Sequence, residues 1–257
     1  MFKTSLAAAF VALLCSAPVL AEPILIGDEA KIRETAEEAG IELHVKAPYY
    51  INLAGDERNV EMSAQKILAS GKLAHEMGAE TVVFHPGFYG DLSKEETMSR
   101  VVANLRDIRN VFVREGWKPR LGMEVMGKRN VFGSLDEVIE VCSRVKGVIP
   151  VVDFAHIHAR GNGILQNPED FQAVFERLAS LNLDKYLIHF TGIHYENGNA
   201  RYRLPIKKGD LKFEPLGARS ESTNLGLVKS EFIQPYGLFN GVVAGVEVSS
   251  VFGVVED

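Results

Sequence analysis

Cysteine is nearly absent from this chain, which has two cysteines in 257 residues. If the N-terminal segment that holds Cys15 is removed, Cys142 is the one thiol left, and a single thiol cannot form an internal disulfide. A disulfide-stabilised scaffold is therefore excluded, and cysteine usage does not indicate the cellular compartment.

The chain also lacks an excess of positive charge, because 28 Lys and Arg stand against 34 Asp and Glu for a net charge of −6. Nonspecific attraction to nucleic acid or to an anionic membrane is not expected, although a local basic rim could still bind phosphate. No apolar run after the N-terminus is long enough to span a bilayer. With 46% hydrophobic and 24% charged residues, the chain can bury a full core, and we expect one domain.

The first residues have the pattern of a secretory signal peptide. Lys3 precedes an apolar stretch from Leu6 to Leu14, and the small residue Ala21 is suited to cleavage. We expect a signal peptide over residues 1–21, a single domain over 22–257, and an exported or periplasmic protein. The alternative for the apolar stretch is a buried first strand or helix.

Four metal-capable side chains each close a short apolar run: His85, Glu124, Asp153 and His189. They are separated by 39, 29 and 36 residues, and each interval accommodates one strand, one helix and two loops. This spacing is typical of a (β/α) barrel, in which the C-terminal ends of parallel strands meet at one rim. Two histidines and two carboxylates that meet there would form a metal site.

Amphipathic patterns that end in glycine or begin at a capping serine predict helices between the apolar runs. The predicted helices cover residues 28–40, 63–78, 95–116, 135–144 and 168–181. Five βα steps are visible where a complete barrel has eight, and the pattern is lost after Pro215. We expect a TIM (β/α) barrel that is incomplete or irregular at its first two and last strands, with His158 in a loop.

Several motifs resemble the endonuclease IV family of apurinic/apyrimidinic endonucleases, which share a barrel with xylose-isomerase-like enzymes. The matching segments are APYYINLA from Ala47, FHPG from Phe84, GMEVMG from Gly122, VVDFAHIHARG from Val151 and HFTGIHY from His189. The resemblance covers about residues 41–216, and the tail over 217–257 diverges from it.

The resemblance implies a zinc-dependent hydrolase that cuts DNA on the 5′ side of abasic sites in base excision repair. It implies that His85 and Glu124 bind metal with Glu124 bridging two ions, and that Asp153 and His189 complete the second ion. His156 would face a third ion. A cytoplasmic location, the alternative to export, would follow from the same resemblance.

The chain departs from the family pattern at three ligand positions. Lys46 stands where the family has a histidine, and an ammonium has no lone pair for zinc. Arg203 stands where the family has a histidine for the third ion. Glu247 is the best candidate for the last-strand glutamate, ahead of Glu221. We therefore expect two zinc ions, with manganese as the other suitable metal.

The chemistry of these residue types agrees with phosphodiester hydrolysis. Two cations roughly 3.5 to 4 Å apart activate a water molecule and stabilise the charge that gathers on the phosphate oxygens. We expect Glu124 to be the catalytic metal bridge and a metal-bound hydroxide to be the nucleophile.

Basic and aromatic residues near the predicted rim are candidates for DNA binding. Tyr49, with Tyr50, is suited to stacking against a base or an abasic gap. A basic segment follows the strand that holds His189: Arg201, Arg203, Lys207, Lys208 and Lys212. The plainer interpretations are that the tyrosines pack the rim and that the basic segment is a solvated loop.

Two other functions remain open at this point. The same barrel and ligands could serve a metal-dependent sugar isomerase or epimerase, and the divergent ends could mark a truncated, inactive family member. The expected partner is DNA with abasic sites; no protein partner is implied, and we expect a monomer.

Overall fold

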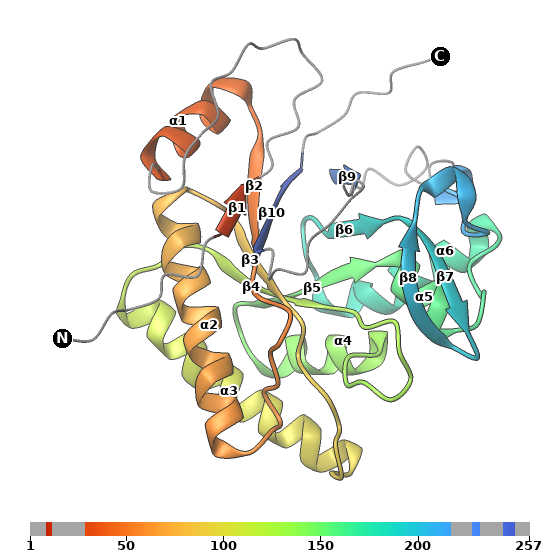
Figure 1. The fold of residues 1–257 in the computed structure, drawn as a ribbon, viewed down its shortest axis with the longest axis horizontal. Coiled ribbons are helices and arrows are strands. Elements are labelled where there is room, and N and C mark those ends of the chain that lie inside the picture. Colours follow the sequence, from red (N-terminus) through yellow and green to blue (C-terminus); the bar gives the residue numbers. More distant parts are fainter. Residues whose placement is uncertain (1–8, 12–28, 217–227, 232–243, 250–257) are drawn as a thin grey trace.

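Five parallel strands, neighbours in the order of the sequence, form the centre of the computed structural model, which describes residues 9–11, 29–216, 228–231 and 244–249. They are β2 (Glu42–Lys46), β3 (Thr81–Phe84), β4 (Arg120–Glu124), β5 (Val148–Asp153) and β6 (Leu187–Phe190). Nearly all of their residues are buried, as in parallel sheets covered on both faces. The strands curl into a half-barrel (Figure 1).

The edges of the sheet are irregular, as the sequence predicts. Strand β9 (Val228–Glu231) pairs in parallel with β6. On the other side, β10 (Ala244–Ser249) pairs antiparallel with β2, and β1 (Ala9–Val11) pairs with β10. The expected incomplete TIM barrel is confirmed, with an antiparallel strand where a complete barrel would continue in parallel.

Helices lie around the outer side of this sheet (Figure 1). They are α1 (Glu29–Ala39), α2 (Glu57–Glu76), α3 (Lys94–Arg114), α4 (Leu135–Arg144) and α6 (Pro168–Leu178), which continues into the 3-10 turn η1 (Ala179–Leu181). Helices α3 and α4 begin at capping boxes built on Ser93 and Ser134. The predicted start of α2 was six residues late, because Asp56 caps a first turn that is mostly polar.

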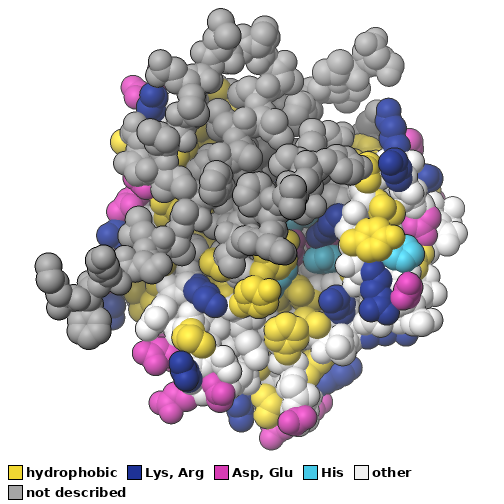
Figure 2. Space-filling model, viewed as in Figure 1, with side chains coloured by type: hydrophobic (Ala, Val, Ile, Leu, Met, Phe, Trp, Pro, Cys, Tyr) yellow, Lys and Arg dark blue, Asp and Glu magenta, His cyan; other side chains and the backbone are white. Residues whose placement is uncertain are grey.

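Two elements near the rim were not predicted. The short helix α5 (Phe154–Arg160) follows β5 directly and contains His158, so the expected loop there is wrong. The hairpin of β7 (Gly192–Glu196) and β8 (Asn199–Leu204) precedes the turn η2 (Ile206–Lys208), and it places the start of the basic segment in a strand. Beside the hairpin, Figure 2 shows histidine side chains among basic and apolar ones.

The predicted signal peptide lies outside the described residues except for Ala9–Val11, which form β1. Among the helices that are described, none combines the length and the apolar character needed to cross a lipid bilayer.

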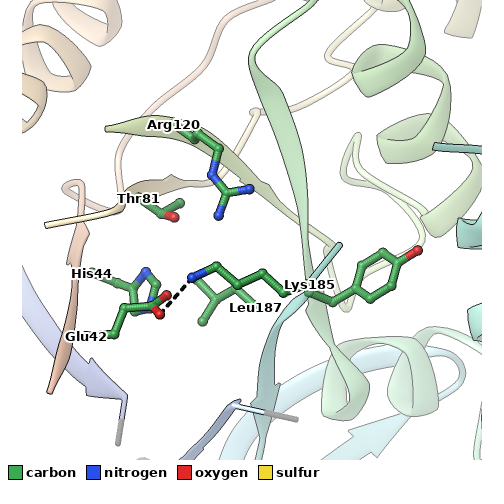
Figure 3. A pocket seen from close by; sticks show the side chains of 7 residues that line it. Glu42, His44, Thr81, Arg120, Lys185 and Leu187 are labelled. Carbon is green, nitrogen blue, oxygen red and sulfur yellow. Dashed lines mark hydrogen bonds and ion pairs between the residues drawn. The ribbon is translucent and has the colours of Figure 1, made fainter. Parts of the chain in front are cut away.

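A cluster of polar side chains lies at the N-terminal ends of the barrel strands. Glu42, His44, Thr81, Arg120 and Lys185 converge on a small cavity (Figure 3). His44, which is 2% exposed, lies 3.2 Å from Glu42 through Nε2, and Lys185 Nζ lies 2.8 Å from the other Glu42 oxygen. The cluster therefore closes the end of the barrel that is opposite the predicted metal site.

The packing of α2 on α3 leads to a first prediction. Helix α2 brings Gly71 against the fully buried ring of Phe112, where an added Cβ would approach ring atoms to 2.2 Å. Alanine at Gly71 should lower the free energy of unfolding by about 1–3 kcal/mol through overpacking, despite a gain of about 1 kcal/mol in helix propensity. Urea denaturation measures this effect, and Phe112→Leu should offset part of it in the double variant. A stabilised Gly71→Ala protein would contradict the tight contact.

The cluster in Figure 3 leads to a prediction on pH dependence. The adjacent imidazole of His44, and then the hydrogen bond from Lys185, lower the pKa of Glu42 to about 2 despite its partial burial. A lowered folded-state pKa stabilises the fold above the ordinary pKa of 4.5, and this stability is lost as the pH falls toward 2. Glu42→Gln should lower the free energy of unfolding by on the order of 1–3 kcal/mol at pH 7 and by progressively less toward pH 3, as urea denaturation at each pH measures. The control Glu80→Gln changes a more exposed partner of Lys185 and should show little of this pH dependence.

Candidate functional site

Polar side chains from successive strands meet at the C-terminal ends of the barrel strands. Lys46, Glu124 and Asp153 are the last residues of β2, β4 and β5. His85 directly follows β3, and His189 lies in β6 paired with Asp153. Glu124 is 1% exposed and Asp153 is 0% exposed, so two carboxylates are fully buried at this rim.

Glu124 lies at the centre of this group. Its Oε2 is 2.6 Å from His85 Nε2 and also bonds to the ammonium of Lys46, while its Oε1 is 2.6 Å from His189 Nδ1. Burial alone would raise the pKa of Glu124, but the charge of Lys46 and the neighbouring imidazoles hold it well below its ordinary value. Glu124 is therefore an ionised carboxylate that orients its neighbours.

Asp153 is bound by Arg203, which comes from the hairpin strand β8. Both carboxylate oxygens bond to the guanidinium, and Arg203 Nη1 also donates to Thr191 Oγ1 at 2.8 Å. Burial opposes ionisation of Asp153, but the charge of Arg203 holds its pKa below the ordinary value. Asp153 also accepts the backbone N–H of His156 at 2.8 Å, so it caps helix α5.

His156 is held so that one ring nitrogen can accept. Its Nδ1 lies 2.7 Å from the carbonyl oxygen of Val125, which can only accept, so the ring proton is on Nδ1. Its Nε2 then carries a lone pair, 3.1 Å from Arg203 Nη2. Burial lowers the pKa of His156 to about 4, so the ring is neutral near pH 7 and able to bind a metal.

The donor atoms fit one divalent ion. Glu124, Asp153 and His156 each offer a ligand atom, and the three atoms lie within 4.8 Å of one another. A second ion shared by Glu124 and His85 would have to displace the ammonium of Lys46, whose Nζ lies 3.2 Å from His85 Nε2. Among the described residues, one three-residue donor set is this close together, and the expected second ion stays a prediction because the side chain of its candidate ligand Glu247 lies outside them.

The predicted DNA-binding residues divide into two groups. Tyr49 and Tyr50 are 57% and 75% exposed, and the Tyr49 ring centre lies 5.1 Å from that of His85. The exposed basic residues are Arg201, which pairs with Glu196, Lys207 and Lys208 in η2, and Lys212, which donates to the carbonyl of Gly209.

Arg203, in contrast, reaches into the site and contacts Asp153, and its contact with DNA stays a prediction. Glu247 pairs with His44 in the backbone register of β10 and β2, but its side chain lies outside the described part of the structure, as does all of Glu221.

Sequence reasoning missed two groups that organise this site. Thr191, which directly follows the last residue of β6, accepts a hydrogen bond from Arg203. The carbonyl oxygen of Val125 determines which ring nitrogen of His156 carries the proton. The Asn197-Gly198 pair, with both φ angles positive, is the turn signal that would have predicted the hairpin and with it the inward position of Arg203.

Comparison with known sequences gives three findings. Residues 6–224 match the family described as "Xylose isomerase-like TIM barrel", a range that begins inside the predicted signal peptide. The chain is 31% identical over 188 residues to an uncharacterised protein of Methanocaldococcus jannaschii, covering 71% of this chain and 67% of the relative. It is 28% identical over 142 residues to "Probable endonuclease 4" of Mycoplasma pneumoniae, covering 52% of this chain and 48% of that protein.

Solved structures support the same fold. A D-tagatose 3-epimerase-like protein superposes with a TM-score of 0.63 at 21% identity, covering 80% of this chain and 75% of that one. Endonuclease IV from Thermus thermophilus superposes with a TM-score of 0.59 at 20% identity, covering 76% of this chain and 71% of that one. An IOLI protein with a bound zinc atom superposes with a TM-score of 0.58 at 15% identity, covering 79% of this chain and 72% of that one. With the family match extending over most of its length, the chain belongs to the xylose isomerase-like TIM barrel family.

Proposed function

We propose that this protein is a metal-dependent phosphodiester hydrolase that cuts DNA on the 5′ side of abasic sites. The observation that carries the proposal is the group of donors at the rim, the buried Glu124 and Asp153 with the partly buried His156, near the exposed ring of Tyr49. The motif resemblance and the similarity to "Probable endonuclease 4" support the DNA substrate.

The donor set is suited to zinc, and manganese is the second choice, because imidazole and carboxylate ligands serve both metals. Glu124, Asp153 and His156 would hold the ion, with His85 and His189 bound to Glu124. When bound, a divalent ion supplies Lewis-acid stabilisation of the negative charge that develops on phosphate oxygens.

The protein's own groups contribute charge and orientation. Lys46 and Arg203 place two positive charges at the rim, where they attract a phosphate and stabilise its charge. Glu124 stays ionised and fixes the rings of His85 and His189. The site is thus arranged to bind an anionic group between Lys46 and Arg203.

The surface around the site supports a long substrate. Tyr49 and Tyr50 offer exposed rings for stacking in the gap of an abasic nucleotide, and Lys207 and Lys208 are exposed basic residues for flanking phosphates. We propose that the protein acts as a monomer and is exported; a cytoplasmic protein is the alternative that DNA repair favours.

A sugar isomerase or epimerase is the second candidate. The single-ion donor set favours it, because stabilising an enediolate needs one Lewis acid rather than a metal pair. The structural similarity to a D-tagatose 3-epimerase-like protein concerns the fold and agrees with this alternative. An inactive family member is the third candidate, and loss of the ligands expected at Lys46 and Arg203 is its basis.

The central prediction concerns Glu124→Gln. The amide cannot replace the carboxylate as a ligand, so nicking of a duplex oligonucleotide with one abasic analogue should fall by at least about 100-fold, with a circular dichroism spectrum that stays native. A chelator should abolish nicking by the unmodified protein, and added zinc should restore it. Full activity of Glu124→Gln would show that Glu124 is not a ligand of the catalytic metal.

A second prediction separates DNA from a sugar as substrate. Tyr50→Ala should weaken binding of abasic DNA by roughly 1–3 kcal/mol, and Lys207→Ala with Lys208→Ala should reduce the salt dependence of binding by about two phosphate contacts. Lys72→Ala, which removes an exposed lysine of α2, is the control and should change neither measurement. Epimerisation of a ketose, with no nicking of abasic DNA, would replace the hydrolase by the second candidate.

A further inference from the structure

Two cationic side chains at the rim each contact two potential metal ligands. The ammonium of Lys46 contacts Glu124 Oε2 and lies 3.2 Å from His85 Nε2. The guanidinium of Arg203 binds both oxygens of Asp153 and lies 3.1 Å from His156 Nε2. The donors that a metal ion would use are therefore already in contact with positive charge from the chain itself.

This arrangement pairs each buried carboxylate of the described site with a cation of the chain. Two buried carboxylates, Glu124 and Asp153, face two cations, Lys46 and Arg203. A divalent ion would add two positive charges to a group in which each buried carboxylate already contacts a cation of the chain, and an uncompensated buried charge is unfavourable.

An anionic ligand removes this penalty. A tetrahedral oxyanion supplies negative charge, and its oxygens match the donors of Lys46 and Arg203. If the two cations bind the oxyanion, the carboxylates of Glu124 and Asp153 become available to the metal ion. The metal and the anion would then compensate each other within one site.

We propose that Lys46 and Arg203 are built-in counter-ions that make divalent metal binding at the barrel mouth dependent on a bound phosphate-like oxyanion. The inference rests on the proposed metal site but is independent of DNA as the substrate. Because such coupling is reciprocal, the metal must strengthen oxyanion binding by the same factor.

Titration of the metal-free, full-length protein with Mn²⁺, followed by electron paramagnetic resonance, tests the proposal. Sulfate is the oxyanion probe, because it keeps its charge over the working pH range, and chloride holds the ionic strength constant. Saturating sulfate should tighten Mn²⁺ binding by roughly 10-fold or more, within the range typical of coupling between sites.

Variants identify the residues responsible. Arg203→Met should bind Mn²⁺ more tightly than the unmodified protein in chloride, and sulfate should then have a smaller effect. Arg203→Lys retains the charge and should retain most of the sulfate dependence of Mn²⁺ binding. This variant also keeps the proposal testable if Arg203→Met does not fold. Lys72→Met, a change on the exposed face of α2, is the matched control and should behave as the unmodified protein.

The outcomes are distinct for the two proposals. Tight Mn²⁺ binding that sulfate does not change would overturn the coupling and leave the metal-dependent function in place. The same sulfate dependence in Arg203→Met as in the unmodified protein would also overturn the role of Arg203. Failure to bind Mn²⁺ with or without sulfate would contradict both this inference and the metal-dependent function.

Discussion

The buried carboxylate of Glu124 is the constraint on which the rest of the site depends. A charge that is almost fully removed from water must be compensated, and here Lys46 and two imidazoles surround it. These partners come from β2, the end of β3 and β6, so one carboxylate joins segments that are far apart along the chain. The curled sheet makes this possible because its strands end at the same rim.

The two basic residues at the rim place positive charge beside the potential metal ligands. Lys46 and Arg203 occupy positions beside ligand atoms, and together they satisfy both carboxylates. A site of this kind is suited to recognising negative charge as well as to holding a metal. Beside it, the exposed ring of Tyr49 lies 5.1 Å from that of His85.

The sequence predicted the barrel and the positions of the rim residues, because strand, helix and loop lengths repeat with Glu124 and Asp153 at strand ends. It also marked Lys46 and Arg203 as unsuited to binding zinc. It could not show what they do instead, because the contact of Lys46 with Glu124 spans 78 residues and that of Arg203 with Asp153 spans 50. The sequence also could not show how Arg203 reaches Asp153, because that position depends on the hairpin of β7 and β8.

Asp153 has two tasks in one side chain, since it belongs to the charged rim and also caps α5. Truncating it would therefore disturb a helix as well as the chemistry, and the two effects would be confused. Asparagine keeps an oxygen for the His156 N–H while removing the charge that Arg203 neutralises. Replacing one carboxylate oxygen of Asp153 by an amide nitrogen thus removes the negative charge while the cap of α5 is kept.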